Sequence, residues 1–203
     1  MSRRSLAFPI VISGPSGAGK TTLAQRLLAS DPLIRRSIST TTREPRAGEQ
    51  EGRDYFFVDR ARFEQLKNGE LIEWAEVHAA SYGTRRAFVE AQLAAGWDVL
   101  LNIDIQGGDR VKKMFPAAVM VFILPPSLAD LEQRLRNRGD LTSADFKLRL
   151  EAARTEIGAS ARYDYLVVND DLDRAERDLT AIVRAERCRR ERTVADTVRR
   201  LVD

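Results

Sequence analysis

The chain has 203 residues, of which 43% are hydrophobic and 31% are charged, and this composition excludes disordered and fibrous proteins. Its 33 Lys and Arg residues nearly balance its 30 Asp and Glu residues, so the net charge of +3 gives no reason to expect a nucleic-acid partner. Length and composition together predict one globular domain over residues 1–203.

Cysteine usage and the first apolar segment indicate the cellular setting. Cys188 is the single cysteine, which rules out a disulfide within the chain and suits a reducing cytoplasm. The apolar run near the beginning of the sequence breaks into a glycine-rich turn after a few residues, too early for a secretory core or a membrane span. We therefore expect a cytoplasmic protein with no membrane partner.

Short apolar strands alternate with amphipathic helices along the chain. A helix is predicted over about residues 20–29, and the segment after Leu172 is helical by periodicity. This alternation is typical of an α/β protein whose parallel sheet is covered on both faces. The predicted buried strands are residues 8–13, 99–104, 119–124 and 163–168.

Two regions interrupt the alternation. Residues from about 37 to 95 carry shorter polar strands, such as 55–58, and an amphipathic piece at 63–66, which predicts an inserted lobe. Residues from about 126 to 156 follow a Pro-Pro pair and contain a predicted helix at 128–138 and a second, charged helix. The arginine spacing there suggests a mobile helical lid.

The segment between the first strand and the first helix predicts a phosphate-binding loop. It satisfies the pattern G-x-x-x-x-G-K-[ST], whose glycines let backbone amides wrap a phosphate. Lys20 would carry a positive charge to the terminal phosphates, and Thr21 would offer its hydroxyl to Mg²⁺. The motif predicts a nucleoside triphosphate but does not distinguish GTPases, ATPases and kinases. The residues of the motif are Gly14, Pro15, Ser16, Gly17, Ala18, Gly19, Lys20 and Thr21.

A second anion site is predicted in the turn-rich segment 39–49, which concentrates hydroxyls and two arginines. Arg43 and Arg46 could clamp a phosphate from two sides, since guanidinium groups match phosphate oxygens bidentately. A phosphotransferase needs such a clamp to hold an anionic acceptor in line with the donor, whereas a hydrolase acting on water does not. The two arginines alone leave surface ion pairing as an equal alternative.

The string RLRNRG predicts a cationic helix face in the lid. Arg134 and Arg138 lie four residues apart and share a face, and Arg149 follows the intervening loop. Their convergence would place positive charge over a transferring phosphoryl group. The alternative is an exposed helix whose arginines pair with Glu132 and Glu151.

Taken together, these segments resemble the guanylate kinase family over residues 8–187, nearly the whole chain. The resemblance implies a P-loop NTPase fold with a parallel sheet core, an inserted GMP-binding lobe and a helical lid. It also implies a nucleoside monophosphate kinase of purine metabolism that phosphorylates GMP to GDP with ATP and Mg²⁺. The strings that carry it, in the family's order, are GPSGAGKTT, STTTREPRAGE with DYFFV, ELIEWAEVHAASYGT, IDIQG, RLRNRG and VVNDD.

The same resemblance implies a role for particular residues. Thr22 would extend the ATP-binding loop, and Asn169 would contact the adenine of ATP. The residues implied to bind GMP are Ser39, Arg43, Arg46, Tyr55, Glu73, Tyr82, Thr84 and Asp104. Of these, Arg43, Arg46, Tyr55 and Tyr82 would reach the phosphate, and Glu73, Thr84 and Asp104 would recognise guanine. The residues expected to carry catalysis are Lys20, Arg43, Arg134, Arg138 and Arg149.

The guanine assignment can be checked against the chemistry of the base. Guanine presents its N1–H and N2–H donors beside the O6 acceptor, so a carboxylate at Glu73 and a hydroxyl at Thr84 are complementary to it. Adenine presents the opposite pattern, and a buried carboxylate facing it would be left unpaired. The pair therefore predicts strong selectivity for guanine.

The sequence departs from the family pattern at two positions. Asn102 stands where the family usually has Asp, so it keeps the shape and an acceptor oxygen but not the charge. Ser81 stands where the family often has an aromatic residue, and we expect this change to be tolerated. His78 is the only histidine, and we assign it no catalytic or metal-binding role.

Two other functions remain open on the sequence. A sugar-phosphate kinase of the same fold is disfavoured because a sugar offers no guanine edge to Glu73 and Thr84. An interaction module that binds phosphopeptides is disfavoured because Lys20, Thr21 and the lid arginines are all present. The sequence leaves open whether dGMP also serves as acceptor and whether the protein is a monomer or a homo-oligomer.

Overall fold

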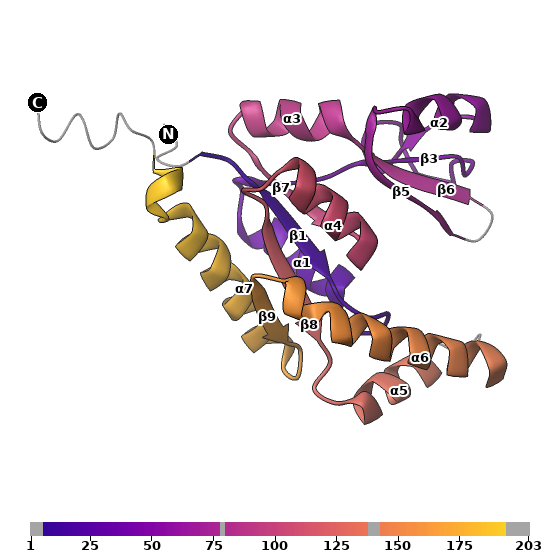
Figure 1. The fold of residues 1–203 in the computed structure, drawn as a ribbon, viewed down its shortest axis with the longest axis vertical. Coiled ribbons are helices and arrows are strands. Elements are labelled where there is room, and N and C mark those ends of the chain that lie inside the picture. Colours follow the sequence, from indigo (N-terminus) through magenta and orange to yellow (C-terminus); the bar gives the residue numbers. More distant parts are fainter. Residues whose placement is uncertain (1–5, 78–79, 138–142, 194–203) are drawn as a thin grey trace, which may run out of the picture.

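The computed structural model describes residues 6–77, 80–137 and 143–193 (Figure 1). At its centre is a five-stranded sheet with the order β2-β7-β1-β8-β9, in which every neighbouring pair is parallel. This architecture confirms the predicted α/β class. The strands are β1 (Pro9–Ser13), β2 (Ile34–Arg36), β7 (Asp98–Asn102), β8 (Val119–Leu124) and β9 (Tyr165–Val168).

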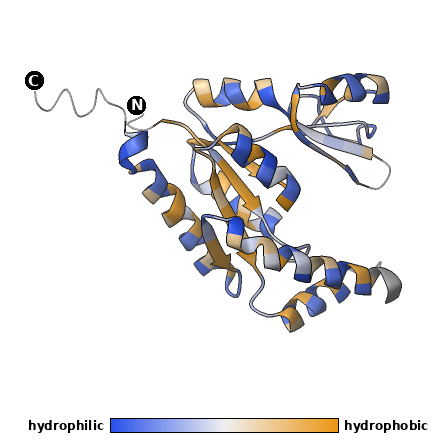
Figure 2. Ribbon diagram, in the orientation of Figure 1, coloured by the Kyte–Doolittle hydropathy of each residue, from blue (hydrophilic) through white to orange (hydrophobic). Residues whose placement is uncertain are grey.

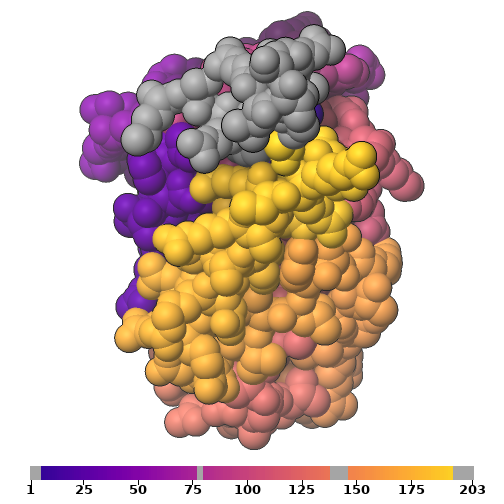
Figure 3. Space-filling model, turned by 90° about the vertical axis from the view of Figure 1, so that its left-hand side faces the viewer, coloured from indigo at the N-terminus to yellow at the C-terminus, as the bar shows by residue number. Residues whose placement is uncertain are grey.

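Helices cover both faces of this sheet, which explains why its inner strands β7, β1 and β8 are almost entirely buried. Ile10 and Ile12 of β1 pack on one face with α1 (Lys20–Ser30) and α7 (Leu172–Arg187). Val11 packs on the other face with α3 (Arg86–Ala94) and α4 (Ile105–Met114). Figure 2 shows the hydrophobic residues gathered in the central strands, and Figure 3 shows α7 along the outer surface.

Two of the predicted central strands are two residues shorter at one end than expected. β7 ends at Asn102 rather than at Asp104, because the Asp104 carboxylate accepts a hydrogen bond of 2.7 Å from the Gly107 amide and caps α4. β9 begins at Tyr165 rather than at Tyr163, after the 3-10 helix Ala159–Arg162. Both differences lie at the ends of strands, where local hydrogen bonds compete with the sheet.

The region between β2 and β7 forms a second sheet, with the order β4-β3-β6-β5. Its β3–β6 and β5–β6 pairs are antiparallel. The helix α2 (Arg60–Lys67) packs on it through a small core of its own, which contains Phe63, Leu66 and Leu71. The predicted strand at 55–58 is reduced to two residues. The strands are β3 (Ser39–Thr41), β4 (Phe56–Phe57), β5 (Leu71–Val77) and β6 (Ala80–Arg85).

Two helices follow β8, α5 (Leu128–Arg136) and α6 (Ser143–Gly158). Ser127 caps α5 by accepting a hydrogen bond from the Asp130 amide, and Ala153 of α6 is buried in a separate cluster with residues of α5. Figure 1 shows this pair and the second sheet extending from the same side of the central sheet. Within the described ranges no helix is long and apolar enough to cross a membrane.

Candidate active site

The segment between β1 and α1 folds as a tight loop that only glycine can form at three positions. Gly14, Gly17 and Gly19 have φ angles of 145°, 89° and 95°, in the region that L side chains rarely adopt. A Cβ atom at Gly14 would lie 2.3 Å from the carbonyl oxygen of Ile123 at the end of β8. The glycines are therefore required both by torsion and by close packing against the sheet.

Lys20 begins α1 and folds back over this loop. Its Nζ donates hydrogen bonds of 2.5 Å to the Gly14 carbonyl and 2.9 Å to the Pro15 carbonyl. The charge of the lysine is thereby held beside the loop amides that would face a phosphate. A pocket of about 390 Å³ opens here, lined by Gly14, Ser16, Gly17, Gly19, Lys20, Thr21, Thr22, Asn102, Ile103, Asp104 and Glu156.

Arg43, the first of the two arginines predicted to bind the acceptor phosphate, is held by an acidic residue and lies beside two tyrosines. Arg43 donates to both carboxylate oxygens of Glu49, at 2.8 and 2.9 Å, and its guanidinium lies 5.4 Å from the Tyr55 ring centroid. The Tyr82 ring lies 6.0 Å from that of Tyr55. The Arg43 hydrogen bonds lower the pKa of Glu49, and Glu49 in turn raises the pKa of Arg43. The Arg46 backbone amide also donates to Glu49, at 2.8 Å, so the same carboxylate holds the Arg43 side chain and the Arg46 backbone.

The predicted guanine-recognising residues converge between the two sheets. Glu73 and Thr84 are opposite each other in the β5–β6 pair, and the Thr84 hydroxyl donates a hydrogen bond of 2.6 Å to Glu73 Oε1. A Cβ at Gly107 would lie 3.2 Å from Glu73 Oε2 and 3.3 Å from Asp104 Oδ1, so both carboxylates meet at the start of α4. Burial raises the pKa of Glu73, the Thr84 hydrogen bond lowers it, and the Asp104 charge raises it further.

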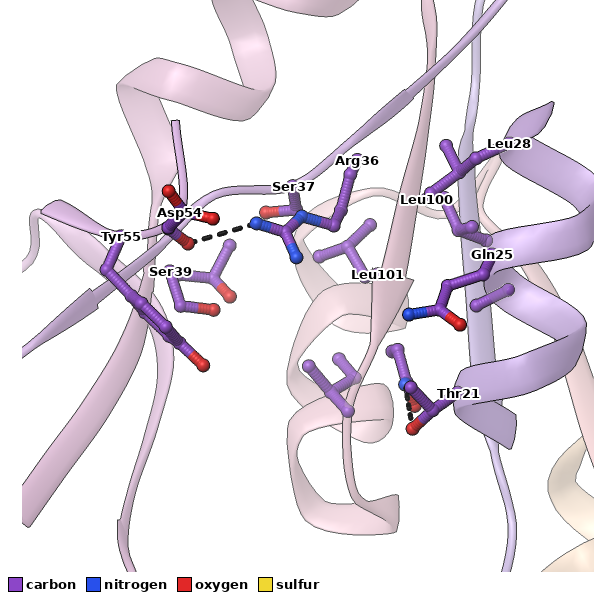
Figure 4. A pocket seen from close by; sticks show the side chains of 14 residues that line it. Thr21, Gln25, Leu28, Arg36, Ser37, Ser39, Asp54, Tyr55, Leu100 and Leu101 are labelled. Carbon is purple, nitrogen blue, oxygen red and sulfur yellow. Dashed lines mark hydrogen bonds between the residues drawn. The ribbon is translucent and has the colours of Figure 1, made fainter. Parts of the chain in front are cut away.

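A second pocket of about 270 Å³ extends from α1 to the second sheet (Figure 4). Thr21, Gln25 and Leu28 of α1 line it on one side, and Ser39 and Tyr55 line it on the other. Figure 4 shows Ser39 and Tyr55 across the cavity from Thr21 and Gln25. This pocket shares three lining residues with the phosphate-loop pocket, so the predicted donor and acceptor sites adjoin. The shared residues are Thr21, Asn102 and Ile103.

Comparison with known proteins decides the family. A family model described as guanylate kinase matches residues 7–186. The chain belongs to the guanylate kinase family. A guanylate kinase of Aromatoleum aromaticum is 52% identical over 181 residues, which cover 89% of each chain. One of Chromobacterium violaceum is 48% identical over 195 residues, covering 94% of this chain and 93% of the relative.

Solved structures agree with this assignment. The crystal structure of guanylate kinase from Anaplasma phagocytophilum superimposes with a TM-score of 0.74 and 37% identity, covering 98% of this chain and 95% of that one. A sugar kinase from Janibacter has a TM-score of 0.50 and 17% identity over 86% of this chain and 93% of its own, which shows a shared fold alone. The predicted P-loop NTPase fold is confirmed, but the fold by itself does not select the acceptor.

The three arginines predicted to form the lid of this guanylate kinase family member differ in how the structure places them. Arg134 donates a hydrogen bond of 3.0 Å from Nη2 to the Asn169 carbonyl. Both residues line a pocket with Gly17 and Gly19 of the phosphate loop. Arg149 is half-buried on α6 and makes no hydrogen bond or ion pair with the part of the chain that the structure describes. The predicted Arg138 lies outside the described residues.

Sequence reasoning assigned no role to two acids that the structure places in these sites. Glu49 holds Arg43, and its only sequence signal was its position in the arginine-containing turn. Glu156 of α6 lines the phosphate-loop pocket; burial raises its pKa, the nearby Lys20 lowers it and Asp104 raises it. No local pattern distinguishes Glu156 from the other charged residues of its helix, because its partners are far away in the sequence.

Asn102 offers a test of this guanylate kinase site. Its Nδ2 donates to Thr21 Oγ1 at 3.5 Å, at the wall that the two pockets share. Asn102→Asp would reverse the bond so that the threonine hydroxyl donates, and would add a negative charge where a hydrated cation is expected. We expect turnover to be retained or raised, with half-saturation at a lower Mg²⁺ concentration in steady-state assays. A large fall in turnover by a folded variant would contradict this interpretation.

Proposed function

We propose that this chain transfers the γ-phosphoryl group of ATP to the phosphate of GMP, giving ADP and GDP. The observation that carries the proposal is the shared wall of Thr21, Asn102 and Ile103 between the phosphate-loop pocket and the cleft beneath the second sheet. Two nucleotides held on either side of that wall would meet at their phosphates. Membership of the guanylate kinase family supports the same assignment.

The transfer needs no separate general base. An oxygen of the GMP phosphate, already an anion, attacks the γ-phosphorus while the bond from that phosphorus to the β–γ bridging oxygen breaks. ADP leaves with the bonding electron pair, and no proton has to be removed. The work of the protein is therefore to align two polyanions and to neutralise the charge that spreads over the equatorial oxygens.

We assign these tasks to the residues predicted from the sequence. Lys20 and the loop amides hold the β- and γ-phosphates, and Arg43 with Arg46 holds the acceptor phosphate. The charge of Arg43 is secured by the Glu49 carboxylate and is positioned by Tyr55. The remaining assignments are Tyr82 on the acceptor phosphate, Ser39, Glu73, Thr84 and Asp104 on GMP, Asn169 on adenine, and Arg134, Arg138 and Arg149 as lid cations over the transferring group.

The residues near Thr21 fit a hydrated Mg²⁺ that arrives with the nucleotide. The Thr21 hydroxyl, the Asn102 amide and the carboxylates of Asp104 and Glu156 supply hard oxygen donors to one pocket. Among the described residues no group of three or more His, Cys, Asp or Glu side chains could hold a metal. A pocket with a few oxygen donors suits Mg²⁺, because this ion keeps several waters and binds phosphate oxygens. When bound, the ion would neutralise charge on the phosphates.

The proposal divides the chain into three parts with separate tasks. Residues from about 37 to 95 would form the acceptor lobe, those from about 126 to 156 the lid, and the parallel sheet with its helices the donor-binding core. Closure of the lobe and lid over the core would exclude water from the phosphates. We also propose a cytoplasmic location, which the exposed, unpaired thiol of Cys188 supports.

A coupled ADP-release assay over a panel of acceptors tests the proposal. We expect release with ATP and Mg²⁺ to be fastest with GMP and much slower with AMP, UMP or a ribose phosphate. The rate with dGMP shows whether the ribose 2′-hydroxyl is needed. Equal or faster turnover with AMP or UMP would contradict the acceptor assignment. A calorimetric titration without heat from ATP would favour a phosphopeptide-binding module.

A further inference from the structure

Asn169 follows β9 and turns its side chain into the protein. It is 6% exposed, and its Nδ2 donates a hydrogen bond of 2.7 Å to the carbonyl oxygen of Ala18, across 151 residues of sequence. Ala18 belongs to the phosphate-binding loop and is fully buried. A buried amide group of the core thus contacts the loop that would grip the triphosphate.

The contact supplies a hydrogen-bond donor to a carbonyl group that the loop conformation turns into the protein. A loop that turns its amide hydrogens inward, toward a phosphate, turns carbonyl oxygens outward. The Ala18 carbonyl is directed into the protein rather than into water, and a buried carbonyl without a donor is costly. Asn169 supplies that donor. The hydrogen bond therefore favours the peptide orientation in which the loop amides remain available to an anion.

The same carboxamide also restrains the next residue. Gly19 has a φ of 95° at the N-cap of α1 and leads directly into Lys20. A Cβ atom at Gly19 would lie 2.1 Å from Asn169 Nδ2, so the side chain of Asn169 fills the space that a Cβ would need. Packing and hydrogen bonding together fix the left-handed turn just before Lys20.

The backbone of Asn169 is itself fixed and reaches the lid. Its amide donates to the Leu124 carbonyl at 2.8 Å, which ties it to the end of β8. Its carbonyl accepts the Arg134 hydrogen bond of 3.0 Å from α5. Near the tip of the loop, a Cβ at Gly17 would lie 3.1 Å from a methyl of Leu131 on α5. The helix α5 therefore reaches the phosphate loop in two ways, through Asn169 and by direct packing of Leu131 beside Gly17.

We propose that Asn169 is a positioning residue that holds the phosphate-binding loop in its anion-binding conformation and connects it to Arg134. The inference rests on the proposed function only in that the ligand of the loop is a triphosphate. It differs from the adenine contact expected from the family resemblance, because it requires no base. A positioning role affects any triphosphate, whereas an adenine contact affects ATP alone.

Calorimetric titration with Mg²⁺ complexes of ATP and of inorganic tripolyphosphate separates the two roles. Asn169→Asp keeps the shape but places an oxygen against the Ala18 carbonyl, so both ligands should lose affinity by a similar factor of about ten or more. Asn169→Ala removes the donor without adding charge, and it should also lower the affinity for both ligands. GMP affinity should stay within about twofold, because the acceptor pocket is not touched.

The matched control is Asn68→Asp, the same substitution at an exposed residue that ends α2, and it should change neither affinity. Loss of ATP affinity with unchanged tripolyphosphate affinity would overturn the inference in favour of an adenine contact, and unchanged affinity for both would overturn it outright. Unfolding of both Asn169 variants would make Asn169 a residue of the general fold and would also overturn it. Failure of the wild-type protein to bind ATP would instead contradict the proposed function.

Discussion

Replacing Lys20 by alanine should reduce turnover with ATP and GMP about 1,000-fold, the scale expected when one preorganised charge is removed from a phosphoryl-transfer site. The Lys20 ammonium is held beside the loop by the Gly14 and Pro15 carbonyls, so it needs little reorganisation when a phosphate arrives. Its charge matters most in the transition state, where negative charge spreads over the transferring group. We therefore expect the loss mainly in kcat, measured by coupled ADP release.

The fold should survive this change. The positive φ angles of the loop are those of Gly14, Gly17 and Gly19, which the substitution leaves in place, so the Tm should shift little. Lys113→Ala removes a lysine from the exposed face of α4 and provides the matched control, with unchanged turnover expected. A Lys20→Ala enzyme that keeps more than about a tenth of wild-type turnover would show that the loop does not act as proposed.

Replacing Glu73 by glutamine should lower kcat/KM for GMP about 100-fold or more, because a carboxamide accepts at one atom where the carboxylate accepts at two. Each hydrogen bond to a buried charged group is worth about 1.5–3 kcal/mol, and the amide hydrogens of glutamine would oppose a guanine N–H donor. The Thr84 hydroxyl can still donate to the remaining oxygen, which preserves the packing between β5 and β6. ATP affinity should be unchanged, since Glu73 does not line the phosphate-loop pocket.

The Glu73→Gln substitution should lower activity but should not lower the stability of the fold. Burial raises the pKa of Glu73 in the folded state, so the folded protein binds this proton more tightly than the unfolded chain does. The resulting contribution to stability is present at low pH and is lost as pH rises through the raised pKa, which means that the ionised carboxylate destabilises the protein at neutral pH. Glu73→Gln should therefore have an equal or higher Tm at pH 7.

The same pKa shift predicts how GMP binding depends on pH. Guanine donors require the ionised carboxylate, so acidification should weaken GMP binding from a higher pH than an ordinary glutamate would allow. The matched control is Glu76→Gln, at an exposed position of the same strand, where no change in GMP affinity is expected. Unchanged kcat/KM for GMP in Glu73→Gln would remove the basis for guanine selection.

Local patterns were sufficient for the central fold and for the conformation of the glycine-rich loop. The run 119–124 is β8 as predicted, and the glycine-rich string 14–21 forms the loop between a strand and a helix. Both are specified by residues that are close in sequence. A continuous apolar run specifies a strand covered on two faces, and glycines specify the positions of the loop where φ is positive. The ends of β7 and β9 were predicted less well, because a capping carboxylate and a 3-10 turn compete there with the sheet.

The predicted acceptor residues were identified from the family resemblance, but their arrangement depends on packing between distant segments. Glu73 and Asp104 lie 31 positions apart in the numbering and meet only because α4 begins beside β5, with glycine at position 107 leaving room for both carboxylates. Apart from its position in the arginine-containing turn, no feature of the sequence distinguished Glu49 from the other acidic residues. Its role became evident when the turn placed it against Arg43.

The sequence by itself determined the parallel α/β core, the phosphate-binding loop and the family to which the chain belongs. The core and the loop depend on periodicity and on backbone torsion, which a short stretch of residues specifies locally. The family was recognised from several strings that occur in the family's order along the chain. Only the tertiary structure decided that Asn169 reaches Ala18, that Glu156 faces the phosphate pocket and that two pockets share one wall. Such contacts arise from the packing of whole helices and sheets, and no local pattern records which distant side chain will fill a given space.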